Sequence, residues 1–163
     1  RDDEVWGRYN PLDSVDKSYL LISYEIMNNS KYFLSLVLYI DQYNALSWHS
    51  IPYHISMNFN MNTGELINLE EYSELIQDSL LIYKISDFSF SRLIELDVSD
   101  SDWVYEGTYP LWENFRVYNI RNDSLILTFD VYQVAPYSEG HIQIGMPLSI
   151  FMNSERRRKE KEK

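Results

Sequence analysis

The sequence of 163 residues contains no cysteine. Disulfide bonds, thiolate nucleophiles and metal sites with cysteine ligands are therefore excluded. Glycine and proline are also scarce, with five residues of each, which excludes fibrous and low-complexity classes. The length and composition predict a single globular domain over residues 1–152, followed by a charged tail over residues 153–163.

Long apolar runs are missing as well. The longest one covers residues 32–40, less than half of the ~20 residues that a membrane helix needs. We therefore expect no membrane span in this chain. The sequence begins at Arg1 and not at a methionine, so the removal of a signal peptide or of a lipid-anchored segment stays open.

Basic residues are outnumbered, with 14 against 25 acidic ones and a net charge of −11. Residues 155–163 hold 6 of the basic and 3 of the acidic residues, which leaves 8 and 22, a net charge of −14, for residues 1–154. A body of this charge repels phosphate backbones and anionic lipid, so we expect no nucleic-acid partner. It attracts cationic partners, although solubility alone is the alternative explanation.

Catalytic and cofactor-binding motifs are absent from the sequence. There is no glycine-flanked hydrolase serine, no phosphate-binding loop, no dinucleotide fingerprint and no His-Glu-x-x-His zinc motif. The three histidines, His49, His54 and His141, lack the spacing of metal ligands, and strand alternation places His54 and His141 on solvent faces. We therefore expect no cofactor, no metal ion and no catalytic residue.

Alternating apolar and polar residues predict several β-strands. Residues 20–26 and 33–40 form one predicted hairpin, in which the alternating apolar residues of the first strand are buried. Residues 112–120 and 125–134 form a second hairpin, and a short strand follows over residues 142–146.

The clearest alternation lies between residues 53 and 61, where odd-numbered residues are apolar and even-numbered ones are polar. A period of two predicts that the first set faces the core and the second faces water. The predicted core face carries Tyr53, Ile55, Met57, Phe59 and Met61, and the predicted solvent face carries His54, Ser56, Asn58 and Asn60.

One amphipathic helix is predicted over residues 69–82, because its apolar residues recur at helical spacing. Asn68 and Glu71 have the spacing of a capping box at its start. The segment 83–98 fits either a helix or a strand. Hairpins combined with one such helix predict an α+β fold, a mostly antiparallel sheet with the amphipathic helix packed on one face.

Acidic and aromatic residues gather between residues 97 and 112. The acidic loop lacks the glycine and the terminal glutamate of a calcium-binding EF-hand. Tyrosine and tryptophan are favoured on recognition surfaces, although filling the core is the alternative. The loop contains Asp97, Asp100 and Asp102, and the aromatic residues that follow include Trp103, Tyr105 and Tyr109.

Three stretches resemble a known bacterial family. Residues 129–140 read Phe-Asp-Val-Tyr-Gln-Val-Ala-Pro-Tyr-Ser-Glu-Gly and residues 142–147 read Ile-Gln-Ile-Gly-Met-Pro. Residues 58–69 read Asn-Phe-Asn-Met-Asn-Thr-Gly-Glu-Leu-Ile-Asn-Leu. These stretches are similar to motifs of the RsiV C-terminal-type domain, a family of unknown function, and the resemblance covers about residues 33–148.

The resemblance implies an exported bacterial domain in the periplasm or at the cell surface, with a lipid anchor as one form. Members of the family occur in the extracellular part of an anti-sigma factor that senses lysozyme, beside a peptidoglycan deacetylase domain, and alone. The family has no established catalytic residues, so the resemblance assigns none here. It makes a basic, lysozyme-like protein or peptidoglycan the expected partner.

These observations predict a non-catalytic domain that binds or senses a partner. A cell-wall hydrolase with a carboxylate pair and a structural accessory domain are the alternatives. The candidate partner-binding residues are Asp97, Asp100, Asp102, Trp103, Tyr105, Tyr109, Tyr137 and Glu139.

Overall fold

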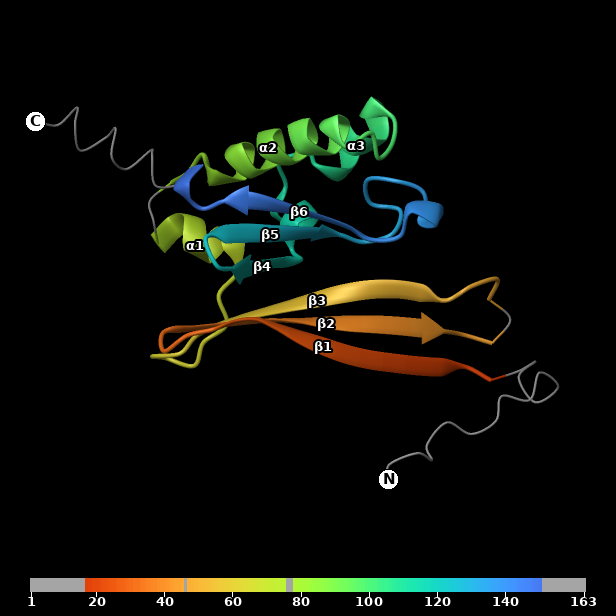
Figure 1. Ribbon diagram of the computed structural model, residues 1–163, viewed down its shortest axis with the longest axis horizontal. Coiled ribbons are helices and arrows are strands. Elements are labelled where there is room, and N and C mark those ends of the chain that lie inside the picture. Colours follow the sequence, from red (N-terminus) through yellow and green to blue (C-terminus); the bar gives the residue numbers. More distant parts are fainter. Residues whose placement is uncertain (1–16, 46, 76–77, 151–163) are drawn as a thin grey trace, which may run out of the picture.

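The computed structural model describes residues 17–45, 47–75 and 78–150. Three strands are followed by helices and then by three further strands (Figure 1), which confirms the predicted α+β class. The predicted domain limits, residues 1 and 152, and the tail over 153–163 lie outside the described residues. The elements are β1 (Tyr19–Asn29), β2 (Phe33–Tyr43), β3 (Ile51–Asn60), α1 (Leu69–Leu75), α2 (Leu81–Glu95), α3 (Ser101–Gly107), η2 (Trp112–Phe115), β4 (Tyr118–Arg121), β5 (Ser124–Phe129), η3 (Tyr137–Glu139) and β6 (Ile142–Pro147).

The described strands form two antiparallel sheets of three strands each. Sheet A has the order β1-β2-β3, and sheet B has the order β4-β5-β6. Strand β4 contacts all three strands of sheet A, while helices α2 and α3 lie on the far side of sheet B (Figure 1). Sheet B is therefore a middle layer between sheet A and the helices.

The hydrophobic core lies between sheet B and the helices. Helix α2 contributes Leu81, Ile85 and Leu93 at multiples of four residues, and all three are fully buried. Strand β5 contributes Leu127 and Phe129, each 1% exposed, on the face that alternation predicts. The core cluster consists of Leu69, Leu81, Ile82, Ile85, Leu93, Val104, Phe115, Tyr118, Leu125, Leu127, Phe129, Val134, Ile144 and Met146.

Helix α1 begins with the predicted capping box. The Asn68 side-chain oxygen accepts a hydrogen bond from the Glu71 N–H (2.8 Å), and the Glu71 carboxylate accepts one from the Asn68 N–H (3.2 Å). The single helix predicted over residues 69–82 is wrong, because α1 and α2 are separate helices. Most of the segment 83–98, which periodicity left open, belongs to α2.

The second predicted hairpin is present, with shorter strands than predicted. Strand β4 begins only at Tyr118, after the short helix η2, and pairs with β5 in an antiparallel register. Strand β5 ends at Phe129, because the chain turns at once and the Gln133 N–H donates to the Asp130 carbonyl (3.0 Å). The hairpin of β1 and β2 and the final strand β6 are formed as predicted.

The two faces of β3 are reversed relative to the prediction. His54 and Asn58 are only 5% and 2% exposed, although alternation places them in water. They lie on the face of sheet A that contacts β4, where Asn119 donates to the Ser35 hydroxyl (2.9 Å) and accepts from the Ser56 hydroxyl (3.0 Å). Polar groups can be buried at this contact because they form hydrogen bonds to one another across it.

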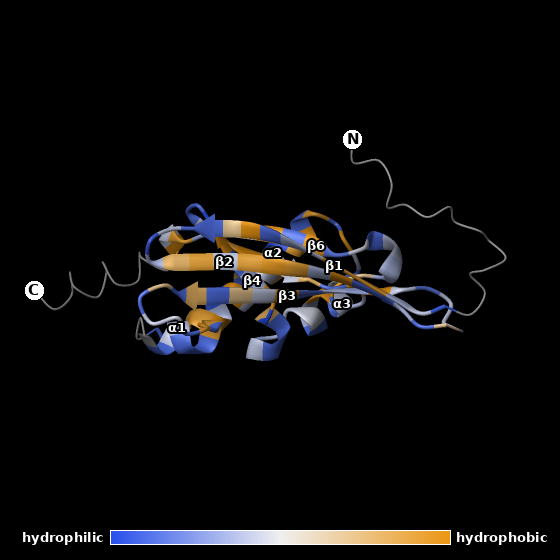
Figure 2. Cartoon of the chain, turned by 90° about the horizontal axis from the view of Figure 1, so that it is seen from below, coloured by the Kyte–Doolittle hydropathy of each residue, from blue (hydrophilic) through white to orange (hydrophobic). Residues whose placement is uncertain are grey.

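No described helix or strand covers the opposite face of sheet A (Figure 2). The strand register places mainly apolar residues on this face. Its residues on β1 were predicted to be buried, but they are 51–70% exposed. The predicted core face of β3 lies on this outer side as well. The strand register places Leu20, Ile22, Tyr24, Ile26, Leu34, Leu36, Leu38, Ile40, Gln42, Ile51, Tyr53, Ile55, Met57 and Phe59 on this face.

Gly140 ends the η3 turn with φ of 68° and ψ of −154°, a conformation that is essentially restricted to glycine. We expect Gly140→Val to lower the free energy of unfolding by about 2 kcal/mol, because a β-branched residue is strained at this φ whatever space surrounds it. The neighbouring His141→Ala should cost less than about 1 kcal/mol, since His141 is exposed. Urea denaturation of both variants checks this, and equal, small losses would contradict it.

Candidate functional site

Two of the predicted partner-binding aspartates have structural roles at helix ends. The Asp100 carboxylate caps helix α3 and accepts hydrogen bonds from the N–H groups of Asp102 (3.2 Å) and Trp103 (3.0 Å). Asp97 follows helix α2 with a φ of 54°, a value that aspartate adopts more readily than most residues. Asp102 lies in the first turn of α3 and is exposed.

Trp103 connects helix α3 to the segment after strand β5. Its indole N–H donates to the carbonyl oxygen of Tyr132 (3.1 Å), and Tyr132 itself has a φ of 67°. The side chain is half-buried. Trp103 therefore positions the segment that carries Tyr132, in addition to any contact that it makes with a partner.

Tyr105 and Tyr109 are exposed and lie together beside helix α2. Their ring centroids are 5.8 Å apart in an edge-to-face arrangement, and the Phe90 ring packs edge-on against Tyr105 at 6.2 Å. These rings form part of a surface groove of about 700 Å³ between α2 and α3, which we call the tyrosine groove. It is lined by Leu80, Tyr83, Lys84, Ser86, Asp87, Phe90, Tyr105, Thr108, Tyr109 and Pro110.

The tyrosine groove carries negative charge. The ammonium group of Lys84 is paired with Asp78 at 2.5 Å, so it contributes little free positive charge. Asp87 lines the groove and has no ion pair among the described residues. Asp102 precedes Tyr105 by three residues on the same helix, so the two side chains share one side of α3.

Tyr137 and Glu139 lie away from the groove, in the η3 turn between β5 and β6. The Tyr137 ring packs on the His49 ring (4.2 Å between centroids) and on the Tyr132 ring (5.6 Å). The Tyr137 hydroxyl donates to the carbonyl of Ser50 (3.1 Å). Tyr137 is thus a packing residue that holds this turn against the β2–β3 connection, while Glu139 is exposed.

A histidine cluster that the sequence did not predict lies close to this turn. The Nδ1 atom of His54 is 2.5 Å from a carboxylate oxygen of Asp130, and Arg116 lies 3.6 Å from the other oxygen. The His141 ring packs edge-on against His54 at 4.6 Å. The pKa of His141 is lowered, first by partial burial and then by His54, while Asp130 opposes the shift. The prediction that His54 faces solvent is wrong, whereas His141 is exposed as predicted. His49 is exposed as well.

The histidine cluster has limited chemistry of its own. Asp130 orients His54 as it would orient a base, but the other ring contacts of His54 are Tyr39 and His141. No group of three or more metal-ligating side chains occurs in the part of the chain that the structure describes. The tyrosine groove, a cavity beside Tyr118 and a cavity beside His54 are each lined by at most one carboxylate. These three cavities therefore do not hold the carboxylate pair of a glycosidase.

A protein-family model matches about half of this chain. Residues 69–149 match the family model described as "Protein of unknown function (DUF3298)". No curated protein matches the sequence. No described helix is long and apolar enough to cross a membrane.

Two crystal structures share the fold. A member of the DUF3298 family from Bacteroides fragilis aligns with a TM-score of 0.60 and 14% identity, over 88% of this chain and 56% of its own. A DUF3298 family protein from Pseudomonas aeruginosa aligns with a TM-score of 0.55 and 19% identity, over 83% of this chain and 62% of its own. This chain therefore spans less than two thirds of either solved protein.

Proposed function

The chain belongs to the DUF3298 family, the RsiV C-terminal-type domain, and on this basis we propose that it is a non-catalytic domain that binds a basic protein at the bacterial envelope. The observation that carries the proposal is the tyrosine groove. Three of its rings, Tyr83, Tyr105 and Tyr109, are 45–58% exposed although they are large and apolar. Tyrosine combines apolar area with a polar end and is enriched at the centres of protein interfaces.

Charge supports a basic partner over an acidic or neutral one. Residues 1–154 carry a net charge of −14, and Asp87 and Asp102 lie in or beside the groove. Complementary charge raises the rate of association more than it raises the affinity, while buried aromatic rings supply most of the affinity. The family resemblance supports the envelope location and makes a lysozyme-like protein the first one to test.

We expect titration against hen lysozyme to show binding that weakens as salt rises, because the Debye length falls from about 10 Å at 0.1 M to about 3 Å at 1 M salt. The double variant Tyr105→Ala/Tyr109→Ala should bind at least about tenfold more weakly, as expected for aromatic residues at an interface centre. Isothermal titration calorimetry at both salt concentrations measures these effects.

Matched controls separate the groove from general attraction between charges. Tyr24→Ala/Tyr32→Ala removes two tyrosines that are 70% and 61% exposed on sheet A and beside it, and it should leave the affinity unchanged. Charge removal in the groove, Asp87→Asn/Asp102→Asn, is compared with the removal of two exposed charges outside the groove, Glu65→Gln/Asp123→Asn. If all charge variants lose affinity equally and the groove tyrosines have no effect, the association is unspecific and the proposal fails. Binding of soluble peptidoglycan fragments in the groove, with no binding of lysozyme, would assign a cell-wall partner instead.

A further inference from the structure

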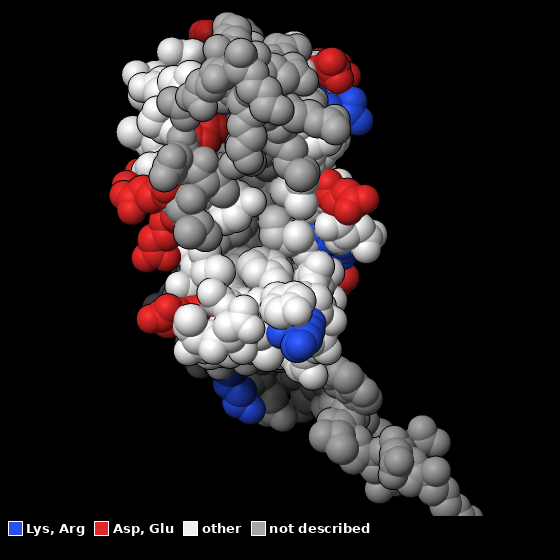
Figure 3. All heavy atoms as spheres, turned by 90° about the vertical axis from the view of Figure 1, so that its left-hand side faces the viewer, with Lys and Arg blue, Asp and Glu red and all other residues white. Residues whose placement is uncertain are grey.

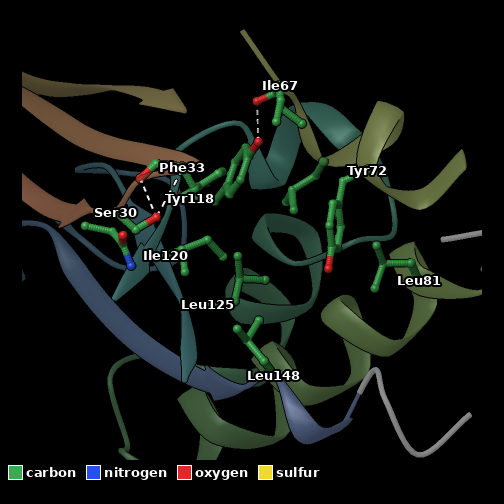
Figure 4. A pocket seen from close by; sticks show the side chains of 11 residues that line it. Ser30, Phe33, Ile67, Tyr72, Leu81, Tyr118, Ile120, Leu125 and Leu148 are labelled. Carbon is green, nitrogen blue, oxygen red and sulfur yellow. Dashed lines mark hydrogen bonds between the residues drawn. The ribbon is translucent and has the colours of Figure 1, made fainter. Parts of the chain in front are cut away.

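A second concave site lies at the opposite end of sheet A from the histidine cluster, where the β1–β2 turn, the β3–α1 connection and β4 meet (Figure 4). Its volume is about 260 Å³. The floor consists of Leu69, Leu81, Tyr118 and Leu125, which are 0–6% exposed. The rim is partly exposed, so the site is open to solvent, and it consists of Asn28, Ser30, Phe33, Ile67, Tyr72, Ile120 and Leu148. We call this site the apolar pocket.

The floor of the apolar pocket offers no free polar group to water. The Tyr118 hydroxyl, the one polar side-chain group of the floor, donates to the carbonyl oxygen of Ile67 (Figure 4). Burial raises the pKa of Tyr118, so this hydroxyl stays protonated and uncharged. A buried water needs two to four polar partners. The floor is therefore suited to an apolar group and not to water.

Polar side chains lie on two sides of the rim, with Asn28 and Ser30 on one side and the Tyr72 hydroxyl on the other (Figure 4). The Ser30 hydroxyl is already bonded to the backbone N–H and carbonyl of Phe33, both at 3.1 Å. The Asn28 side chain makes no hydrogen bond among the described residues and is half-buried beside Ser30. The next residue, Lys31, is exposed, and its ammonium lies 5.3 Å from the Tyr32 ring centroid. A molecule in the pocket thus meets an apolar floor, with a free amide and a positive charge at the Asn28–Lys31 side of the rim.

Charged side chains near this end of the molecule lie around the pocket and not in it. Seen from this side, acidic side chains lie along both flanks, basic side chains lie on the right flank and toward the bottom, and the described surface between them is largely uncharged (Figure 3). No charged side chain lines the pocket itself. A charged group would lose its hydration inside such a site without gaining a partner, so only an uncharged part of a ligand can enter it.

We propose that the apolar pocket binds an unbranched aliphatic chain whose polar head lies at the Asn28–Lys31 side of the rim. The volume of the pocket limits the length of the aliphatic chain, because an apolar cavity of about 150 Å³ accommodates the six carbons of benzene. In proportion, the pocket of about 260 Å³ accommodates about ten carbons. A free fatty acid, a fatty alcohol and a lipid with a cationic head all carry such a chain.

The length of the chain provides the sharpest test. Affinity for hexanoate, octanoate, decanoate and dodecanoate is measured by calorimetry below their micelle concentrations. Each added methylene should raise the affinity about fourfold, since a buried methylene contributes about 0.8 kcal/mol. The increase should stop near ten carbons, where the pocket is full. Affinity that rises without a plateau would place the chain on an open surface and overturn the proposal.

Filling the pocket tests its position. Leu148 lies on the rim, and its backbone N–H is held by the Asp123 carbonyl at 2.8 Å, so Leu148→Trp should place an indole in the pocket without moving the chain. It should weaken decanoate binding at least tenfold. Leu111→Trp changes an exposed leucine that lines neither the apolar pocket nor the tyrosine groove, and this variant should bind like the wild type. Ile120→Trp replaces Leu148→Trp if that variant does not fold.

Two further measurements identify the head and the site. The affinities for decanoate, 1-decanol and decyltrimethylammonium are compared, and the compound that binds most tightly identifies the source of the chain. We expect this compound to be decanoate, because the ammonium group of Lys31 attracts a carboxylate. Isotope-filtered NMR should show contacts between the chain methyl group and the methyl groups of Leu81 and Leu125. Contacts with Ile22 or Ile55 on the outer face of sheet A, unchanged binding by the filled variants, or no binding of any decyl compound would overturn the proposal.

Discussion

Replacing Gly107 with alanine is expected to lower the free energy of unfolding by about 3 kcal/mol or more, although the same change in an ordinary helix stabilises it by about 1 kcal/mol. A Cβ atom at Gly107 would overlap the carbonyl oxygen of Gln133 and lie 2.7 Å from Cγ1 of Val134. The neighbours cannot move aside easily, because Val134 is in the core and the Gln133 side chain is bonded to the Gly107 carbonyl (3.2 Å). Overpacking against backbone lies at the upper end of such costs.

Gly145→Ala is the matched control for this prediction. Gly145 lies in strand β6, and a Cβ atom there would meet only Cδ1 of Ile126, at an ordinary distance of 3.6 Å. We expect its free energy of unfolding to change by less than about 1 kcal/mol. Urea denaturation of both variants, followed by circular dichroism, measures the difference. Equal effects would mean that α3 does not approach the segment after β5 as closely as described.

Phe129→Ala is expected to cost about 3–5 kcal/mol of unfolding free energy. Phe129 is 1% exposed and packs edge-to-face against Phe115, with 6.3 Å between ring centroids. The cavity left by its side chain would lie inside the main core, where sheet B and helix α2 prevent collapse. Chemical denaturation measures the loss.

Phe59→Ala is the matched control, and it also tests the reversed faces of β3. Alternation predicts that Phe59 belongs to a buried face, but the structure places it on the outer face of sheet A and partly exposed. We expect a cost of about 1–2 kcal/mol, since less apolar area returns to water and no enclosed cavity forms. A loss equal to that of Phe129→Ala would contradict the placement of this face.

Local features of the fold follow from local sequence. The capping box of Asn68 and Glu71 depends on residues three positions apart, and the β4–β5 hairpin depends on a turn between adjacent strands. The buried side of β5 also follows from alternation, because Leu127 and Phe129 face an apolar layer. These features could be predicted since each depends on neighbours along the chain.

The face of β3 that is buried could not be predicted in this way. Alternation shows that one face is apolar and assumes that the apolar face is covered. In this chain the layer that reaches sheet A is strand β4, and its Asn119 offers hydrogen bonds to Ser35 and Ser56. Which face is buried depends on the partner, and this partner lies about 60 residues or more away along the chain.

The candidate site also combines features that the sequence shows with features that only the tertiary structure shows. The sequence alone shows the absence of cysteine, the excess of acidic residues and the clustering of aspartates with aromatic residues. Tertiary structure decided that Asp100 serves as a helix cap, that Trp103 bonds to Tyr132, and that Tyr105 and Tyr109 form a groove with helix α2.

Composition thus determined which chemistry this protein can carry, because charge and side-chain type belong to each residue alone. Tertiary packing decided where that chemistry lies. The hydrogen bond between His54 and Asp130 joins residues 76 positions apart. The lining of the apolar pocket includes residues as far apart in the sequence as Asn28 and Leu148. Such sites exist only after sheets A and B and the helices have packed, since no segment contains more than a part of either one.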